Sequence, residues 1–328
     1  MTSYWADFPG MPEALERVSG IIRNTTASPN SIIAGGLATL FDGNGKLLRP
    51  GLLLIAAQFG KTQDRHYQLA ACLEMLHMAT LIHDDVIDNS PFRRGAPSAQ
   101  AQYGQRNAVL LGDYLLSRCF LVAAEYTSAE HAVSLARIIS LICGMEIEQN
   151  SDSFRADFSL RRYLRKIMGK SALLFSLACQ VGAQEAKTSR ALAEKLRRIG
   201  YNIGMAFQII DDILDYEGDP ALVRKPLGAD IRSGVVTLPL ICAMTEARSE
   251  MSVPEASVLK KLFAENHFTA GEADDILEAV RSSGGIATAR VHAARYTGRA
   301  LRGIAELPPG RGRESLDKLT RRLLVRNN

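Results

Sequence analysis

Two short clusters of aspartates are the residues of this chain best suited to chemistry. The first is Asp84-Asp85-Val86-Ile87-Asp88, and the second is Asp211-Asp212-Ile213-Leu214-Asp215. Both follow apolar runs, where carboxylates are costly unless positive charge neutralises them. We expect no adjacent Lys or Arg to pair with either cluster. A hard divalent cation would then balance the carboxylate charge, and such a cation typically binds a phosphorylated substrate.

Helical spacing gives each cluster a direction. Positions i and i+4 of an α-helix lie about 40° apart around its axis, so Asp84 and Asp88 project together. The second cluster repeats this spacing, and the middle aspartates, Asp85 and Asp212, lie about a quarter-turn further on. They are placed to orient ligands or to reach a second ion. Because Mg²⁺ usually takes one or two protein carboxylates, two facing clusters would clamp a diphosphate through bridging ions.

Helices are the elements that must position these clusters. Apolar residues recur at helical spacing over 69–87, and the segments 110–124 and 192–214 are apolar nearly all round, as central helices of a bundle are. Strand signals are scarce, and the Gly/Pro/Asn clusters form no long linker. Since both clusters would face one substrate, we predict a single all-α domain over 1–328. Its core motifs lie in 45–239 and its C-terminal helices in 255–328.

The composition is that of a globular protein with a large core. Hydrophobic residues make up 47% of the chain, charged residues make up 23%, and the net charge is +4 at pH 7. Basic residues are scattered among acids, which argues against nucleic-acid binding. The cysteines form no Cys-x-x-Cys pair, the N-terminus resembles no signal peptide, and apolar runs such as 52–57 are too short to span a bilayer. We therefore expect a cytoplasmic protein.

Further motifs follow the two clusters in a fixed order. Arg93-Arg94-Gly95 and Gly112-Asp113-Tyr114 come after the first, and Lys225-Pro226-Leu227-Gly228 and Thr237-Leu238-Pro239 come after the second. The ordered set resembles the all-trans polyprenyl diphosphate synthases, and is similar to the hepta- and octaprenyl enzymes. A lone Asp-Asp-x-x-Asp would not be specific. The resemblance implies the isoprenoid synthase fold, a bundle of antiparallel helices around a central cavity.

The resemblance implies a Mg²⁺-dependent prenyl transfer. An allylic diphosphate such as farnesyl diphosphate ionises, and isopentenyl diphosphate attacks the allylic cation head-to-tail. Loss of a proton, which the resemblance implies goes to the departing diphosphate, then forms a new trans double bond. No dedicated base is evident beside the clusters. The task of the protein is to stabilise charge on the leaving group and to keep water from the cation.

Roles for individual residues follow from the resemblance. Arg and Lys side chains suit the phosphate oxygens that Mg²⁺ leaves free. The implied catalytic residues are Asp84, Asp88, Asp211, Lys170 and Arg93. The implied metal ligands are Asp84, Asp85, Asp88, Asp211, Asp212 and Asp215. The allylic diphosphate would be bound by Arg93, Lys170, Gln208 and Lys225, and isopentenyl diphosphate by Lys46, Arg49, His77 and Arg94.

Product length in this family depends on the side chains just before the first cluster, which form the floor of a hydrophobic tunnel. Ala79 and Thr80 are small here, and Leu76, one turn deeper, is only moderately large. We therefore predict a product longer than about twenty carbons, in the range of about thirty to fifty.

Three positions depart from the family pattern. Leu47 stands where an Arg is usual, Val235 where a Lys is common, and Arg224 where a Gly is common. Loss of a Lys near a diphosphate should weaken substrate binding. These changes leave open that the chain is a weak enzyme or needs a partner subunit.

Other kinds of protein fit the sequence less well. Terpene cyclases usually lack a second Asp-Asp-x-x-Asp and need no second diphosphate site. A di-iron bundle would need a second Glu-x-x-His pair besides Glu74 and His77, and a phosphohydrolase would need more histidine ligands. The alternative that stays open is a partner-dependent or non-catalytic subunit of a heteromeric synthase. A homodimer is the family expectation, and a long product predicts transient membrane contact at release.

Overall fold

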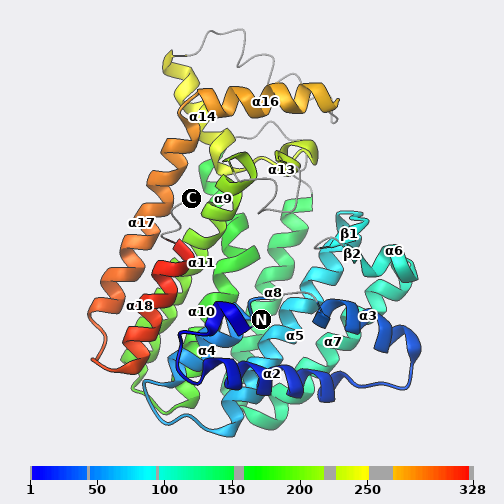
Figure 1. Ribbon diagram of the computed structural model, residues 1–328, viewed down its shortest axis with the longest axis vertical. Helices are drawn as coiled ribbons and strands as arrows, with labels where there is room; N and C mark the ends of the chain where they lie inside the picture. The colour runs from blue at the N-terminus through cyan, green and yellow to red at the C-terminus, as the bar shows by residue number, and fades with distance from the viewer. Residues whose placement is uncertain are drawn as a thin grey trace. The chain divides into compact units, whose positions relative to one another are not determined.

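Helices make up nearly all of the regular structure in the computed structural model of the protein (Figure 1). The structure describes residues 2–42, 45–93, 96–150, 159–217, 227–250 and 269–324. The first half contains α1 (Thr2–Trp5), α2 (Met11–Thr26), α3 (Ser31–Asp42), α4 (Leu48–Ala57), α5 (Asp64–Ile87), β1 (Phe92–Arg93), β2 (Ala96–Pro97), α6 (Ala99–Tyr103), α7 (Gln105–Tyr126) and α8 (Ala129–Asn150). The second half contains α9 (Leu160–Ile167), the π-helical turn η1 (Met168–Ala172), α10 (Leu173–Glu185), α11 (Arg190–Glu217), α13 (Ala229–Arg232), α14 (Leu238–Glu250), α16 (Ala270–Ser282), α17 (Gly285–Ala305) and α18 (Arg311–Leu324).

The only sheet in the described part of the chain is the hairpin of β1 and β2. Phe92 pairs with Pro97 and Arg93 pairs with Ala96, so each strand has two residues. The hairpin is a local turn beside the end of α5. The prediction of an all-α protein is confirmed.

Two compact units, each built from three separate stretches of sequence, make up the chain. Unit 1 comprises Met1–Ala136, Leu174–Gly200 and Ile304–Lys318, and unit 2 comprises Arg137–Leu173, Tyr201–Gly303 and Leu319–Asn328. The first aspartate cluster belongs to unit 1 and the second to unit 2. That the two form one domain stays a prediction.

In unit 1, α5 is the central helix, and α7 packs along its length (Figure 1). A capping box opens α5, in which the Gln63 N–H donates to Nδ1 of His66 at 2.9 Å. Leu69, Leu73 and Leu76 are buried on α5, and so are residues on its other sides. This all-round burial is that of a central helix, although periodicity predicted apolar residues on one side of it. The segment 110–124 was expected to be central in this way, but Leu110, Phe120 and Leu121 of α7 are 50% to 58% exposed.

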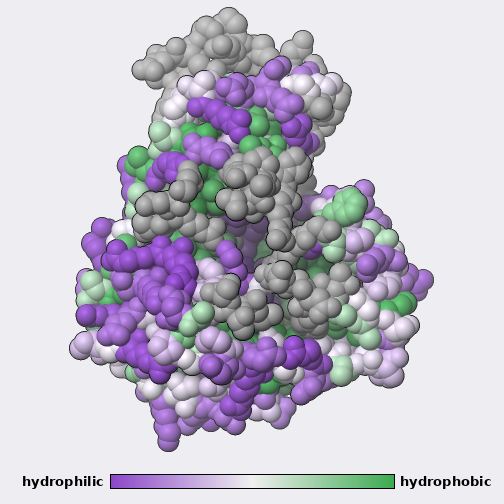
Figure 2. All heavy atoms as spheres, viewed as in Figure 1, coloured by the Kyte–Doolittle hydropathy of each residue, from purple (hydrophilic) through white to green (hydrophobic). Residues whose placement is uncertain are grey.

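The outer helix α2 of unit 1 is amphipathic instead. Met11, Leu15, Val18 and Ile22 are buried along one side of it, at the three- and four-residue spacing of an α-helix. Figure 2 shows that hydrophilic side chains cover much of the face to which α2 belongs. A helix with one apolar side lies at the edge of a core, where the other side meets water.

Unit 2 has its own apolar core, to which α9, α11, α14, α16 and α17 contribute. Met205, Ile209 and Tyr216 on α11 are fully buried in it, together with Leu240 of α14 and Ala289 of α17. The N-terminus of α17 lies so close to α14 that a Cβ at Gly285 would come within 2.6 Å of the Pro239 carbonyl oxygen. Glycine is therefore required at this crossing.

The helix α7 is long and apolar enough, by length and composition, to cross a membrane. The sequence argument considered only uninterrupted apolar runs, whereas α7 contains Asp113 and Arg118. Within its most apolar stretch 39% of the residues are buried, and buried core helices of soluble proteins meet the same criterion. It is weak evidence for a membrane-spanning segment.

Candidate functional site

The first aspartate cluster forms the last turn of α5. Asp84 is half-buried and Asp88 is exposed, and the Asp88 N–H donates to the Asp84 carbonyl at 2.8 Å. The helix ends at this point, and Asn89 follows in the left-handed region with φ 48°. The two carboxylates are therefore carried by the final helical turn, as their spacing predicts.

The middle aspartate of this cluster is directed into the protein. The Asp85 side chain is 3% exposed, and Arg93 Nε donates to both of its carboxylate oxygens, at 2.8 and 3.1 Å. Arg93 Nη2 also contacts Asp85 Oδ1. The expectation that no cation pairs with either cluster is wrong at Asp85. The reason is the turn that ends α5, in which the Ser90 N–H donates to the Asp85 carbonyl at 2.9 Å, so that β1 carries Arg93 back beside the helix. The predicted roles of Arg93 toward diphosphate and of Asp85 toward metal stay predictions.

Gln100, which no sequence motif singled out, holds the same turn from α6. Its Nε2 donates to the carbonyl oxygens of Asp85 at 2.7 Å and Ser90 at 3.0 Å, and the side chain is buried. Ser98 caps α6 and donates to the Ser90 carbonyl at 2.7 Å. The final carbonyls of a helix have no partners within it, so these bonds stabilise the end of α5 beside Asp88.

The Gly112-Asp113 motif serves the approach of α7 to α5. A Cβ at position 112 would lie 2.2 Å from Nε2 of His83, so only glycine allows this contact. His83 Nε2 lies 3.3 Å from the Val109 carbonyl oxygen and 3.4 Å from Oδ1 of Asp113. The motif therefore fixes the residue that precedes Asp84.

Three of the residues predicted to bind isopentenyl diphosphate are described, and all lie in unit 1. Arg49 is in the first turn of α4, with its guanidinium 5.2 Å from the centre of the Phe175 ring. Lys46 is exposed, with its ammonium 5.2 Å from the Tyr4 ring, and half-buried His77 lies on α5 seven residues before Asp84. Arg94 lies outside the described residues. Whether these residues bind isopentenyl diphosphate stays a prediction.

Leu47, which replaces the usual Arg, has an unusual backbone. It is the N-cap of α4, with φ 46° and ψ 45° in the left-handed region, and its side chain is 8% exposed. Such a conformation costs about 1 to 2 kcal/mol for a residue other than glycine. The leucine is thus buried between Lys46 and α4 and adds no positive charge there.

The second cluster lies near the C-terminal end of α11, in unit 2. Asp211 is exposed and Asp215 is half-buried, and the Asp230 N–H donates to Asp215 Oδ2 at 3.2 Å. The Gly228 N–H donates to the Asp215 carbonyl at 2.8 Å, so the last residue of the Lys225-Pro226-Leu227-Gly228 motif lies against the cluster. Lys225 itself, like Arg224, lies outside the described residues.

The middle aspartate of this cluster is also buried, at 6% exposure. Tyr163 donates its hydroxyl to Asp212 Oδ2 at 2.6 Å, and Gln208 Nε2 donates to Oδ1 at 2.9 Å. The pKa of Asp212 is raised to about 7, mainly by burial and next by the negative charge of Asp230. The two hydrogen bonds and the positive charge of Lys170 act in the opposite direction but do not offset this rise. A nearby cation would favour the ionised form of this carboxylate.

Gln208 and Lys170 were both predicted to bind the allylic diphosphate. Gln208 is 5% exposed, and its amide is bonded at both ends, because its Oε1 accepts from Ser171 at 2.6 Å. Lys170 is exposed in the π-helical turn η1, a distortion frequent at functional sites. Lys166 lies four residues earlier. Burial and the charge of Lys170 lower the pKa of Lys166, although the nearby charges of Asp212, Asp230 and Glu146 act to raise it. The two predicted roles stay predictions.

The residues predicted to set product length lie on α5 in unit 1. Ala79 and Leu76 are buried, at 0% and 1% exposure. Thr80 is half-buried and donates its hydroxyl to the His77 carbonyl at 2.8 Å. That these residues form the floor of a product tunnel stays a prediction.

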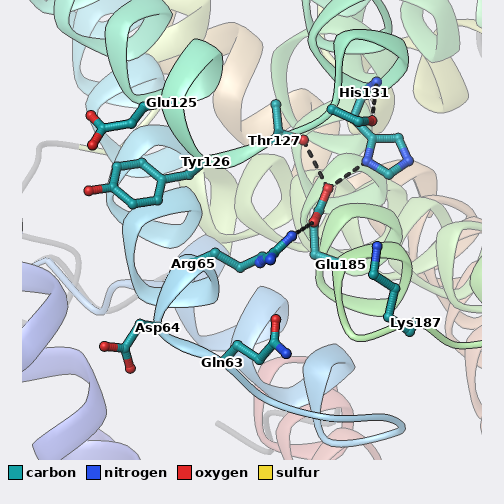
Figure 3. Close-up of a pocket in the computed structure, with 10 residues that line it drawn as sticks. Gln63, Asp64, Arg65, Glu125, Tyr126, Thr127, His131, Glu185 and Lys187 are labelled. Atoms are coloured by element: carbon teal, nitrogen blue, oxygen red, sulfur yellow. Dashed lines mark hydrogen bonds and ion pairs between the residues drawn. The ribbon is translucent and has the colours of Figure 1, made fainter.

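A polar pocket of about 520 Å³ lies at the opposite end of α5 (Figure 3). Glu185 is buried at its centre and accepts from Arg65 Nη1 at 3.3 Å and Thr127 Oγ1 at 2.9 Å, and its Oε1 lies 2.6 Å from His131 Nδ1. The pocket begins at Asp64, so the rise of α5 separates it from Asp84 by about 30 Å. No residue predicted to act in prenyl transfer lines it. The lining residues are Gln63, Asp64, Arg65, Glu125, Tyr126, Thr127, Ser128, His131, Glu185 and Lys187.

The aspartates fit a hard divalent cation such as Mg²⁺. The side chains that reach the accessible ends of α5 and α11 are carboxylates, which suit Mg²⁺ better than soft metals. Within the described residues, no three His, Cys, Asp or Glu side chains form a group that could hold a metal ion. Mg²⁺ usually takes one or two protein carboxylates and completes its octahedron with water and phosphate oxygens.

Comparisons with known proteins agree with the residues described so far. Residues 30–280 match the family described as Polyprenyl synthetase. The chain is 36% identical over 285 residues to heptaprenyl diphosphate synthase component 2 of Geobacillus stearothermophilus, and the match covers 85% of each chain.

Solved structures agree in the same way. Geranylgeranyl pyrophosphate synthase from Lactobacillus brevis matches with a TM-score of 0.91 and 36% identity, over 99% of this chain and 100% of that one. A polyprenyl synthase from Caulobacter crescentus, complexed with calcium and isoprenyl diphosphate, matches with a TM-score of 0.89 and 33% identity, over 96% and 95%. With two aspartate clusters on an all-α frame and matches that span nearly its whole length, the chain belongs to the polyprenyl synthetase family, the trans-prenyltransferases that elongate prenyl diphosphates.

Proposed function

We propose that this enzyme is a Mg²⁺-dependent synthase that elongates an allylic diphosphate with isopentenyl diphosphate. The observation that carries the proposal is the shared design of the two clusters. In each, the middle aspartate is buried and held by protein donors, whereas the outer two are exposed or half-buried. Protein partners thus satisfy Asp85 and Asp212, and the outer carboxylates stay accessible to ions that carry a diphosphate.

Chemistry then depends on how the leaving group is held. When bound, Mg²⁺ stabilises the negative charge of the departing diphosphate. Asp84, Asp88, Asp211 and Asp215 would position that diphosphate, with Arg93 and Lys170 among the side chains that pair with its oxygens. The carbon–oxygen bond breaks, the double bond of isopentenyl diphosphate forms the new carbon–carbon bond, and the departing diphosphate takes the released proton. The buried apolar side chains of α5 would keep water from the allylic cation.

We propose a medium- or long-chain product, longer than about twenty carbons and in the range of about thirty to fifty. The support is the small size of Ala79 and Thr80 and the similarity to a heptaprenyl synthase component. The similar structure named for geranylgeranyl pyrophosphate shows that the frame also serves shorter products. Release of such an apolar product would involve transient contact of this cytoplasmic enzyme with a membrane.

A second candidate is a catalytic subunit that needs a partner. The relative from Geobacillus stearothermophilus is named as component 2 of its synthase, which implies a further component in that protein. In this chain, Leu47 and Val235 replace basic residues usual in the family, so a partner could compensate for weaker diphosphate binding. The accessible aspartates favour catalysis over a purely structural subunit.

The test is to incubate the purified full chain with Mg²⁺, labelled isopentenyl diphosphate and farnesyl diphosphate, and to separate products by length. We expect a ladder that ends at one long product. Asp84→Asn should lower the rate at least about a hundredfold, because it removes charge from the metal side of α5. The matched control is Asp64→Asn on the first turn of the same helix, where Asp64 forms only an exposed ion pair with Arg17.

The outcomes separate the candidates. Wild-type turnover that survives in Asp64→Asn and is lost in Asp84→Asn supports the first proposal. No incorporation by folded wild-type protein, with activity restored by a second chain, supports the partner-dependent subunit. A product that stops at fifteen carbons would contradict the proposed chain length.

A further inference from the structure

A chain of buried hydrogen bonds connects η1 and α9 to the second aspartate cluster in unit 2. Ser171 donates to Gln208, Gln208 donates to Asp212 Oδ1, and Tyr163 donates to Asp212 Oδ2. All four residues are at most 6% exposed, the values being 3% for Ser171 and Tyr163, 5% for Gln208 and 6% for Asp212. Both oxygens of the Asp212 carboxylate are therefore held by neutral donors inside the unit.

The π-helical turn explains how two residues so far apart reach the same partner helix. Residues seven apart share one face of an α-helix, but Tyr163 and Ser171 are eight apart. η1 lies between them and includes Ser171, and a π-bulge takes up one additional residue in a turn. The two hydroxyls consequently face α11 together, opposite Asp212 and Gln208. These lie four residues apart and so share a face of α11.

The two bonds to Asp212 constrain the rotation of α11 about its own axis. Asp212 is the next residue after Asp211, about 100° away around the helix, and precedes Asp215 by three. When the carboxylate of Asp212 is fixed inward, Asp211 is directed away from the core, where it is exposed. A rotation that freed Asp212 would move the other two carboxylates as well.

Stability alone does not explain this arrangement. A buried carboxylate is costly, and an apolar side chain of similar size would pack in its place with equal or greater stability. The two hydrogen-bond partners of Asp212, Tyr163 and Gln208, are neutral polar side chains. The amide of Gln208 is also satisfied at its other end, where it accepts from Ser171. The hydrogen-bond network therefore fits a role in holding the orientation of Asp212 and α11, at some cost in stability.

We propose that Tyr163 and Ser171 are positioning residues, which act through Asp212 and Gln208 to hold Asp211 and Asp215 in place for metal and diphosphate. Their hydroxyls are already donated within the protein, to Asp212 and to Gln208. The inference rests on the proposed function of the aspartates, but it concerns side chains to which no role was assigned.

The experiment is calorimetric titration of the full chain with Mg²⁺ and inorganic diphosphate together, which needs no turnover. Tyr163→Phe removes one hydroxyl and should weaken the Mg²⁺-dependent binding of diphosphate by about tenfold, as loss of a group that supports metal ligands typically does. Ser171→Ala, one bond further from Asp212, should weaken it by about threefold, and Ser171→Thr should keep the wild-type affinity.

Ser176→Ala is the matched control. Ser176 lies five residues after Ser171, is 4% exposed, and donates its hydroxyl to the Arg197 carbonyl at 3.0 Å. Both alanine variants lose one buried hydrogen bond and should lower Tm alike, but only Ser171→Ala should weaken binding. If Ser171→Ala binds diphosphate as tightly as Ser176→Ala does, the network is only structural and the inference is wrong. If Tyr163→Phe fails to fold, the comparison of Ser171→Ala with Ser176→Ala still tests the inference.

Failure of the proposed function gives a different result. Wild-type protein that binds no Mg²⁺ and diphosphate would refute both the function and the inference. Wild-type protein that binds them without turnover would refute self-sufficient catalysis alone. In that case the order of affinities among the variants still tests the roles of Tyr163 and Ser171.

Discussion

At the scale of single residues, adjacent aspartates within each cluster lie in different environments. Asp84 and Asp88 stay on the accessible side of the helix end, whereas Asp85, between them in sequence, pairs with Arg93 in the interior. Asp212 is buried in the same way, although its donors are a phenol and an amide. One helical step of about 100° is enough to separate an accessible carboxylate from a buried one.

Ala79 permits a prediction at this scale. Ala79→Phe should shorten the product, since the ring would fill space beside α5 that the growing chain needs. The control is Ala70→Phe, because Ala70 is equally buried, at 0% exposure, but lies nine residues earlier on the opposite side of the helix. Both changes overpack the core and should lower stability by about 1 to 3 kcal/mol.

Product analysis by reversed-phase chromatography checks this expectation. A shorter final product in Ala79→Phe alone places the floor of the tunnel at that residue. An unchanged length distribution would show that the floor lies elsewhere and that Ala79 is only a packing contact.

At the scale of elements, one buried carboxylate connects three helices of unit 1. Glu185 ends α10, Arg65 lies in the first turn of α5, and His131 lies in the first turn of α8 (Figure 3). Burial raises the pKa of Glu185, but the hydrogen bonds from His131, Thr127 and Arg65 outweigh it and lower the pKa below its usual value of 4.5. The ionised form is thus stabilised by folding.

A pH dependence follows from the sign of that shift. Because the folded-state pKa of Glu185 is lowered, its contribution to stability is present above about pH 4.5 and is lost as pH falls through the lowered pKa. Glu185→Gln should therefore cost about 2 kcal/mol of unfolding free energy at pH 7 and less below pH 4.5. Glu125→Gln, at an exposed position of the same pocket, is the control.

Urea denaturation at pH 7 and pH 4 measures both variants. A cost of Glu185→Gln that is equal at the two pH values would mean that ionisation of Glu185 does not hold the three helices together. Prenyl transfer should be nearly unchanged in folded Glu185→Gln, because the pocket is about 30 Å along α5 from Asp84.

At the scale of the whole molecule, the outer face of α7 bears on assembly. Val109, Leu110, Phe120 and Leu121 are 40% to 58% exposed, and they recur at helical spacing along that face. They form two apolar pairs with exposed Asp113 and Ser117 between them, and exposed apolar side chains gathered on one face are typical of protein interfaces. We propose that a second copy of this chain covers them, in line with the homodimer expected for the family.

Leu121→Asp tests that assembly. Light scattering of the wild-type protein should give the mass of a dimer, and the variant should raise the dimer dissociation constant at least about a hundredfold, as loss of an interface anchor can. Val291→Asp is the control, since Val291 is similarly exposed, at 51%, on α17. A wild-type monomer with full activity would contradict the proposal, and an inactive monomer rescued by another chain would favour a heteromer.

The sequence alone determined the features that depend on local spacing. The aspartates at i and i+4 fix their own direction once the segment is helical, and the apolar periodicity of α5 and α11 predicts helices with buried sides. The order of the motifs identified the family. None of these conclusions depends on which helices are neighbours, so each could be drawn from the amino-acid sequence.

Only the tertiary structure decided which polar groups meet. Tyr163 reaches Asp212 across 49 positions of sequence, and Glu185 reaches Arg65 across 120. Arg93 pairs with Asp85 because the turn at the end of α5 reverses the chain, and Ser171 faces Gln208 because a π-turn changes the helical phase. Sequence spacing carries no signal for such contacts, since they depend on the packing of one helix against another. The partners that fix the middle aspartates inward are for this reason a property of the fold.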